Sequence, residues 1–301
     1  MEKTRLNLGI ACAAGSYKGV FVHGVLDCFD AAGLRAEAYA AASSSAVCAA
    51  HAAAGRLRDL GGPAYWKRAW AAYAASGQDI SAAVLAGIRE ALPSILKTVF
   101  APEAARLAVA ASRVITAEAA EVTQGPGARR LGQQLVLATR SHDTSWAAQH
   151  LRSVLFDTRT EDAARRLTAA NFAEVAYATT RMLHAWKVPA AIDGKPFVDA
   201  SYTCSCPAVQ LAEMGCRKVI AISPEAGPVY SDFFQSAVLP VSHRGVPIRV
   251  VQPSRNLAEL GVDYLKVTEE GLLAAYAEGR RAGDELVEEW FASGGPAGDP
   301  V

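Results

Sequence analysis

The sequence LNLGIACAAGSYKG at residues 6–19 joins an apolar run to a loop of small residues. Residues 6–11 are apolar enough for a buried strand, and residues 12–15 are the small residues through which such a strand passes into a loop. From Val20 to Gly33, apolar side chains recur at the spacing of one helix face. This part of the chain therefore predicts a strand, a tight loop and a helix, in that order.

The same order of elements returns directly downstream. Residues 37–42 predict a second strand, and residues 44–55 predict an alanine-rich helix that ends at a glycine. Further on, β-branched runs at residues 218–222 and 248–251 are each followed within two residues by proline, which suits buried parallel strands. We therefore expect an α/β fold of three layers, in which a mostly parallel central sheet is flanked by helices.

Residues 56–176 differ from the rest of the chain. Their apolar side chains follow helical spacing, and one of the expected helices covers residues 102–122. We expect residues 1–292 to form a single α/β domain in which 56–176 is a largely helical insertion or cap, acting either as scaffold or as a lid. Residues 293–301 are rich in Gly and Pro and predict a flexible tail.

The composition excludes some classes of protein. With 51% hydrophobic residues, the chain is not disordered as a whole. The 30 Lys and Arg residues balance 30 Asp and Glu residues, so the basic excess typical of a nucleic-acid-binding protein is absent. Alanine accounts for 62 residues, which favours helices but indicates no chemistry.

The sequence also bears on location and redox state. Residues 1–14 resemble a signal peptide only weakly, because their apolar stretch is short, and a first strand is the better interpretation. The uncharged run at residues 38–55 is too rich in alanine for a membrane-spanning helix. We expect a cytoplasmic protein, with peripheral contact to a membrane left open. We also expect free, buried thiols at Cys12, Cys28, Cys48, Cys204, Cys206 and Cys216.

Three segments carry residues that could do chemistry. Residues 14–19 form a small-residue loop before a helix, where backbone N–H groups can bind a phosphate or an oxyanion. Residues 41–46 form a strand-to-helix turn of small residues, as a nucleophile elbow requires, although a serine there is more often a helix cap. Asp199 follows a strand at residues 197–198 and is either a turn residue or a carboxylate pointing into the crevice of the sheet.

Taken together, these segments resemble the patatin-like phospholipase family. That family has an oxyanion loop of the pattern G-G-G-x-[RK]-G, then an elbow G-x-S-x-G and later a strand end D-G-[GA]. The corresponding segments here are Ala14-Gly15-Ser16-Tyr17-Lys18-Gly19, Ala41-Ala42-Ser43-Ser44-Ser45 and Asp199-Ala200-Ser201. The resemblance covers about residues 1–55 and 175–290, and several of the family glycines are replaced by alanine or serine.

The resemblance implies a serine acyl-ester hydrolase, either a phospholipase A, a lysophospholipase or an esterase of lipid metabolism. Ser43 would be the nucleophile and Asp199 the base of a two-residue dyad that works through an acyl-enzyme. The oxyanion site would consist of Gly15, Ser16, Lys18 and Gly19. Gly15 and Ser16 would act through their backbone N–H groups, and Lys18 through its positive field. The partner would be an acyl ester or phospholipid, with no cofactor, metal ion or nucleic acid.

Several alternatives stay open at this point. Ser44 is a rival nucleophile, because it too has small residues two positions away on either side. His243 could complete an orthodox triad with Ser43 and Asp199. The replaced glycines favour a degenerate member that only binds a lipid or a partner protein. An active member could also be an acyltransferase, passing its acyl group to an acceptor other than water.

Overall fold

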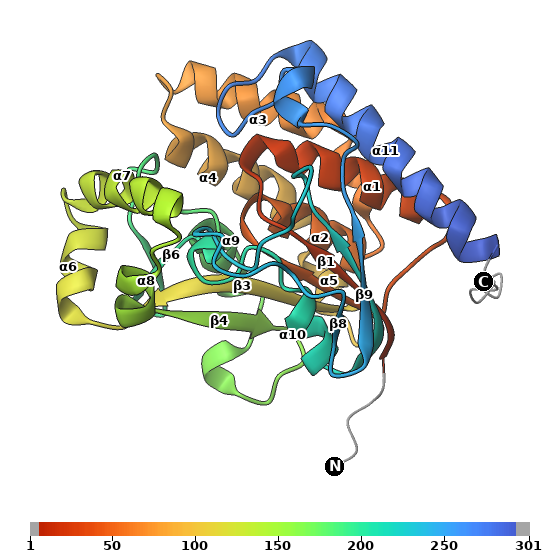
Figure 1. The fold of residues 1–301 in the computed structure, drawn as a ribbon, viewed down its shortest axis with the longest axis horizontal. Coiled ribbons are helices and arrows are strands. Elements are labelled where there is room, and N and C mark those ends of the chain that lie inside the picture. Colours follow the sequence, from red (N-terminus) through yellow and green to blue (C-terminus); the bar gives the residue numbers. More distant parts are fainter. Residues whose placement is uncertain (1–5, 293–301) are drawn as a thin grey trace.

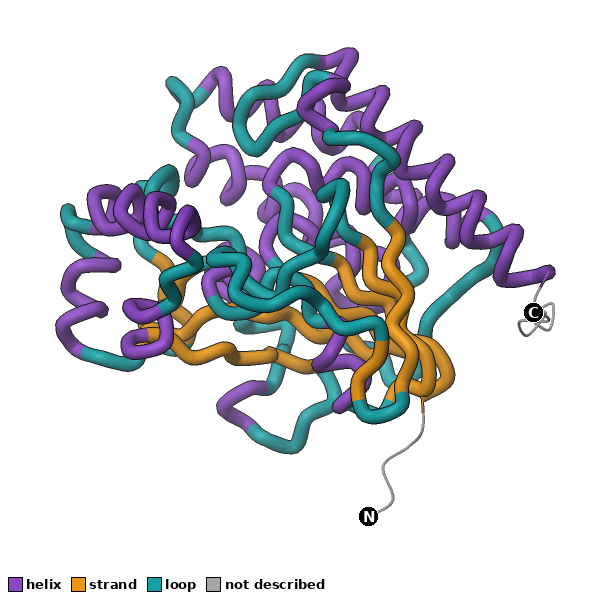
Figure 2. Tube along the Cα trace, viewed as in Figure 1, coloured by secondary structure: helices purple, strands orange, loops and turns teal. Residues whose placement is uncertain are grey.

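Nine strands form one mixed sheet at the centre of the protein, and helices cover both of its faces (Figures 1 and 2). The computed structural model describes residues 6–292. The strands lie in the order β5-β6-β3-β2-β1-β7-β9-β8, and β4 pairs with β3. The expected α/β class, with a sheet between layers of helices, is confirmed. The predicted tail at 293–301 lies outside the described residues.

The central part of the sheet is parallel. Its five strands are, in spatial order, β3 (Arg106–Val114), β2 (Ala38–Ala41), β1 (Leu6–Cys12), β7 (Cys216–Ile222) and β9 (Val246–Val251). The antiparallel strands lie outside them: β4 (Leu151–Asp157) and β6 (Lys195–Val198) pair with β3, β5 (Ala190–Ile192) with β6, and β8 (Ser242–His243) with β9. The strand predicted at the first apolar run is thus the middle strand β1.

The two faces of the sheet are covered by different helices. One face lies under α1 (Gly19–Ala31), α2 (Ala46–Ala53) and α11 (Glu269–Ala292). The other face packs against α10 (Ala208–Glu213). Along β1 the side chains alternate, so that Ile10 and Cys12 join the first core and Ala11 joins the second. The second face presents mainly alanine, which lets α10 lie close to the strands.

The middle region, residues 56–176, contains both helices and sheet strands. Its helices are α3 (Pro63–Ala75), α4 (Ile80–Ala91), α5 (Leu96–Val99), α6 (Ala117–Gln124), α7 (Ala128–Ala138), α8 (Ser145–His150) and α9 (Phe172–Ala178). The prediction of one helix over 102–122 was wrong, because β3 occupies the centre of that range and only its last part, from residue 117, is helical in α6. Since β3 and β4 belong to the sheet, the region is not an insertion separate from it.

The error at β3 has a physical cause. The strand contains three alanines, and alanine favours helices when judged residue by residue. In the structure its side chains alternate instead, with Leu107 and Val109 in one core and Ala108 in the other. Hydrogen bonding to β2, β4 and β6 fixes the extended conformation. Tertiary pairing therefore overrides the local preference.

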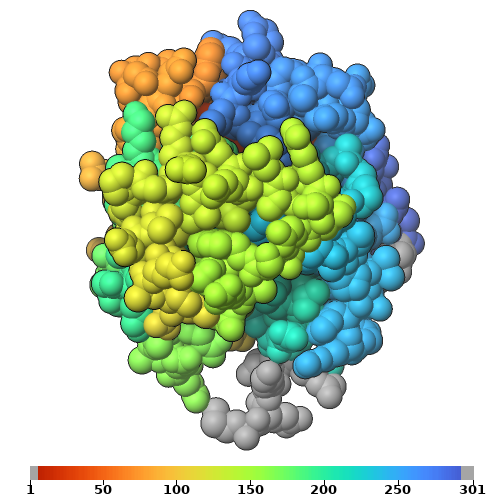
Figure 3. Space-filling view, turned by 60° about the vertical axis from the view of Figure 1, so that its left-hand side comes forward, coloured from red at the N-terminus to blue at the C-terminus, as the bar shows by residue number. Residues whose placement is uncertain are grey.

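Other expectations concern the surface and the thiols. Figure 3 shows α6, α7 and α8 in yellow to yellow-green covering much of one face, below α3 in orange and the blue carboxy-terminal part of the chain. All six cysteines are free and buried, as expected. No helix within residues 6–292 is long and apolar enough to cross a membrane.

Two glycines allow the helices α1 and α11 to touch backbone to backbone. A Cβ atom added at Gly279 would lie 2.2 Å from Phe21 O, and one added at Gly24 would lie 2.3 Å from Tyr276 O. Neither distance is compatible with a methyl group, and backbone atoms cannot move aside as a side chain can. The long helix α11 is therefore fastened to α1, the helix that follows the first loop.

We expect Gly279→Ala to lower the free energy of unfolding by about 1–3 kcal/mol, because the added methyl group would separate α1 from α11. Alanine inside a helix is otherwise about 1 kcal/mol better than glycine, so the sign of the change is informative. Urea unfolding measures it. The matched control is Gly87→Ala in α4, where the nearest atom to an added Cβ is Tyr65 Oη at 3.8 Å. A stabilised Gly279→Ala protein would contradict the close contact.

Candidate active site

Ser43 lies at a sharp turn between β2 and α2. Ala42 is still extended, whereas Ser43 has a φ of 55°, a conformation that is uncommon for residues other than glycine. The turn is tight because its neighbours are small and buried, among them Ala42 and Ala46. Ser45 ties it to the preceding loop by donating from Oγ to Ala13 O at 2.6 Å. A strained serine between a strand and a helix is the geometry of a nucleophile elbow.

The Ser43 hydroxyl donates a hydrogen bond to Asp199. The distance from Ser43 Oγ to Asp199 Oδ2 is 2.8 Å. The other carboxylate oxygen, Oδ1, accepts from Ser201 N at 2.8 Å and from Ser201 Oγ at 2.6 Å. The backbone N–H of Asp199 donates to Arg181 O at 2.9 Å. The two residues expected to form the dyad are therefore brought together, 156 positions apart in the chain.

Strand β3 explains why the two residues meet. β2 pairs with residues 106–109 of β3, and β6 pairs with residues 112–113. Because β4 occupies the other edge of β3 over 108–114, β2 and β6 share one edge. β2 runs parallel to β3 and β6 antiparallel, so their carboxyl ends approach each other from opposite directions. Ser43 and Asp199 lie just beyond those two ends.

Burial changes the acid–base behaviour of Asp199. Its side chain is fully buried, and burial raises the pKa of the carboxyl group from 3.8 to about 6. The hydrogen bonds from Ser201 and Ser43 act in the opposite direction, because they favour the ionised form, but they are the smaller effects. Asp199 is therefore a stronger base than an ordinary aspartate, and it is still ionised above about pH 6.

Thr179 positions the nucleophile and was not identified from the sequence. Its Oγ1 accepts a hydrogen bond from Ser43 N at 2.8 Å and donates to Ala110 O at 2.6 Å. The hydroxyl thus links the elbow to strand β3. Thr179 follows α9 and lies in no recognisable motif, so only the long-range pairing of the strands could have indicated it.

The small-residue loop after β1 passes into a single helical turn at Ser16–Lys18. Ser16 has a φ of 50°, and its Oγ donates to Tyr264 O at 2.6 Å. The backbone N–H groups of Gly15, Ser16 and Ser44 have no hydrogen-bond acceptor among residues 6–292. These three amides are thus the available donors beside Ser43, whereas Ser43 N is already bound to Thr179.

Gly19 does not supply such a donor, since its N–H bonds to Ser16 O within the turn. Its role is spatial: an added Cβ would lie 2.7 Å from the Trp66 ring and 2.9 Å from Ser44 Oγ. Gly19 therefore allows the first loop to approach the elbow and α3 closely.

Lys18 is placed differently from the expectation. It is 3% exposed, and its Nζ lies 2.9 Å from Glu225 Oε2 and 3.8 Å from Asp263 Oδ1. The ring of Tyr264 lies 4.5 Å from the same Nζ. Two carboxylates thus offset the positive field that we expected Lys18 to provide at the oxyanion site. Its contacts instead hold the segment around Tyr264 against the loop.

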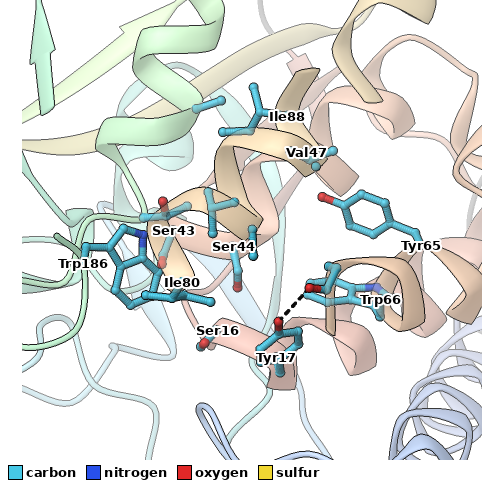
Figure 4. Close-up of a pocket in the computed structure, with 16 residues that line it drawn as sticks. Ser16, Tyr17, Ser43, Ser44, Val47, Tyr65, Trp66, Ile80, Ile88 and Trp186 are labelled. Carbon is cyan, nitrogen blue, oxygen red and sulfur yellow. Dashed lines mark hydrogen bonds between the residues drawn. The ribbon is translucent and has the colours of Figure 1, made fainter. Parts of the chain in front are cut away.

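Ser43 lines a small, largely apolar cavity of about 70 Å³ that is open to solvent. Helices α3 and α4 supply much of its wall, including Tyr65, Trp66, Ile80, Val84 and Ile88 (Figure 4). Ser16 and Ser44 line the same cavity. Part of the middle region thus forms the wall of the candidate site rather than a separate scaffold.

The replaced glycines cause little strain. Ser16 is the one loop replacement with a positive φ, and Ala14, Ala41 and Ala200 all avoid that region. Ser45 has a φ of −78°, which any residue adopts. At Ala14, Ala41, Ser45 and Ala200 the backbone therefore does not require glycine, whereas Ser16 has the positive φ that glycine adopts more easily.

His243 does not take part in this cluster. It lies in β8 at the far edge of the sheet, where its Nε2 is 3.3 Å from Glu213 Oε1. Strands β1, β7 and β9 separate it from the end of β2. The orthodox triad with His243 was therefore a wrong alternative. Within residues 6–292, no three His, Cys, Asp or Glu side chains form a group able to hold a metal ion.

No protein-family model matches the chain, and no curated protein matches it.

The buried carboxylate gives a prediction for stability. The folded state binds the Asp199 proton more tightly than the unfolded state, so the free energy of unfolding falls as pH rises from about 4 to about 6. The asparagine of an Asp199→Asn variant cannot ionise, so the variant lacks this fall. The free energy of unfolding of Asp199→Asn, relative to that of the wild type, is therefore expected to be higher at pH 8 than at pH 4 by up to about 3 kcal/mol. Urea unfolding at both pH values measures the difference, and a difference independent of pH would contradict the prediction.

Proposed function

We propose that the protein is a serine acyl-ester hydrolase of patatin-like type, with phospholipase A, lysophospholipase or esterase activity. The observation that carries the proposal is the 2.8 Å hydrogen bond to the buried Asp199 from the Oγ of Ser43, which lines an apolar cavity. A strained serine, a base in direct contact and free backbone donors nearby are the three components that acyl transfer needs.

The first half-reaction forms an acyl-enzyme. Ser43 Oγ attacks the ester carbonyl carbon while its proton passes to Asp199 Oδ2. Asp199 then returns the proton to the leaving alcohol as the carbon–oxygen bond breaks, and the acyl group stays on Ser43. A pKa near 6 suits this exchange, because the carboxylate is ionised at neutral pH yet more basic than an exposed aspartate.

In the second half-reaction, water repeats the attack on the acyl-enzyme. Asp199 takes a proton from water and gives it to Ser43 as the carboxylic acid leaves. In both halves the negative oxygen is held by the N–H groups of Gly15, Ser16 and Ser44. Loss of one such donor costs on the order of a hundredfold in rate.

The substrate class follows from the cavity. Its aromatic and aliphatic wall suits an acyl chain, and Ser43 lies in that wall, where it could reach the ester carbonyl of a bound chain. An acyl ester or phospholipid is therefore the proposed partner. We expect the protein to act in the cytoplasm and to reach lipid by peripheral contact with a membrane.

Active-site labelling tests the nucleophile. Ser43→Ala is expected to abolish covalent labelling by a fluorophosphonate probe and turnover of a p-nitrophenyl ester, because the attacking oxygen is lost. Ser44→Ala, the neighbouring serine in the same turn, is the matched control and is expected to keep the label. Labelling lost only in Ser44→Ala would make Ser44 the nucleophile. A wild-type protein that neither labels nor turns over esters would instead be the non-hydrolytic binding protein.

The pH profile tests the base. We expect kcat/KM for the ester to rise with pH about a midpoint near 6, because only ionised Asp199 accepts the serine proton. Ser201→Ala removes the 2.6 Å hydrogen bond from the Ser201 hydroxyl to Asp199 Oδ1, which favours the ionised form of Asp199. Its midpoint is therefore expected to lie higher. Ser94→Ala, at an exposed serine, is the control and should keep the wild-type midpoint; an unshifted Ser201→Ala profile would contradict the assignment.

A further inference from the structure

The cavity that Ser43 lines contains a buried hydrogen-bond donor with no acceptor. Trp186 is 7% exposed, and its Nε1 has no hydrogen-bond partner among residues 6–292. Both Trp186 and Ser43 line the cavity, and the nitrogen edge of the indole faces Ser43 in Figure 4. An indole N–H can only donate, so it needs an acceptor from elsewhere.

Two other polar residues of the cavity wall, Tyr17 and Thr180, are already bonded within the protein. Tyr17 Oη donates to Ala69 O at 3.1 Å, and Thr180 Oγ1 donates to Tyr177 O at 2.8 Å. Ser44 Oγ is a second buried atom without a partner, but it lies against the first loop. The Trp186 N–H is therefore left for whatever fills the apolar part of the cavity.

The segment that carries Trp186 is held on two sides. On one side, Ser81 Oγ of α4 accepts from Lys187 N at 2.7 Å and from Val188 N at 3.2 Å. On the other side, Val188 O accepts from Arg181 Nε at 2.8 Å. Ser81 and Arg181 are themselves buried. The backbone next to the indole is thus fixed, and the ring is held in the cavity wall.

An unpaired buried donor is unfavourable by about 1–3 kcal/mol. A phenylalanine could line a cavity for plain hydrocarbon without that penalty. Because buried polar groups in proteins are nearly always bonded, a fixed and unpaired N–H indicates a ligand atom that completes it.

We propose that Trp186 determines specificity by donating a hydrogen bond to an oxygen on the acyl chain of the substrate. The preferred substrate is an ester whose acyl part carries an oxygen acceptor, such as an ether, hydroxyl or keto oxygen, near the ester end. This inference rests on the proposed hydrolase function. The inference adds one feature to the proposed substrate, an oxygen atom on the acyl chain. The apolar wall of the cavity alone would suit a plain hydrocarbon chain.

The test uses p-nitrophenyl hexanoate and analogues in which an ether oxygen replaces the methylene at the third, fourth or fifth position of the acyl chain. An ether oxygen only accepts, which matches a group that only donates. Each kcat/KM is divided by the rate of hydroxide-catalysed hydrolysis of the same ester. We expect the best ether analogue to exceed hexanoate about tenfold in the wild type.

In Trp186→Phe, which keeps an aromatic ring but removes the N–H, we expect that ratio to fall to about one or below, because an unpaired ether oxygen in an apolar cavity is unfavourable. The ratio within one variant is the readout, since a purely structural role for Trp186 would lower both rates and leave the ratio unchanged. Trp146→Phe removes an indole from the groove between α6, α7 and α8, and should keep the ratio.

The outcomes separate the two proposals. Turnover of hexanoate with no preferred ether analogue would overturn the role of Trp186 and leave the hydrolase proposal intact. Absence of turnover with every ester would overturn both. If Trp186→Phe does not fold, a ¹⁵N spectrum of the wild type, which has 5 tryptophans, replaces it. One indole signal should then move when Ser43 carries an ether-containing phosphonate, and should stay in place with the hydrocarbon phosphonate.

Discussion

The edge of strand β3 is the constraint on which the candidate site depends. β2 and β6 pair with successive parts of that edge and run towards each other, so the residues after their ends are forced into contact. Thr179 Oγ1, bound to Ala110 O, fills the space between the two ends and accepts from Ser43 N. A shift of β6 by one residue would turn Asp199 to the opposite face of the sheet. The geometry of the dyad is thus a property of strand register more than of the loops around it.

The sequence predicted the local parts of this arrangement and not the strand that joins them. Ser43 and Asp199 could be proposed because small residues around a serine, and a carboxylate after a strand, are local signals. β3 was predicted as a helix, since its alanines resemble a helix until their pairing partners are known. Thr179 and Trp186 had no signal, because their contacts join segments far apart in the chain. Long-range pairing is the information that composition and periodicity lack.

The alanine excess can be interpreted in the light of these contacts. Alanine at the turn after β2 lets the elbow bury itself, and alanine on the second face of the sheet makes room for α10. The position that does need a positive φ, Ser16, is held by its own hydroxyl on Tyr264 O. The ion pair of Lys18 with Glu225 fastens the same segment. These specific contacts thus stabilise a positive φ at a serine, a conformation that glycine adopts without such support.

The contact between α1 and α11 has a consequence for the order of folding. Strand β1 lies between β2 and β7, and α1 packs on residues 269–292, so the surroundings of the first loop are complete only once the last part of the described chain is present. During synthesis the amino-terminal third can form helices and the β1–β2 pair, but the loop and the elbow stay unsupported until α11 has emerged from the ribosome. Such non-local closure slows folding and leaves apolar strand faces open in the meantime. The nascent chain is thus expected to depend on chaperones.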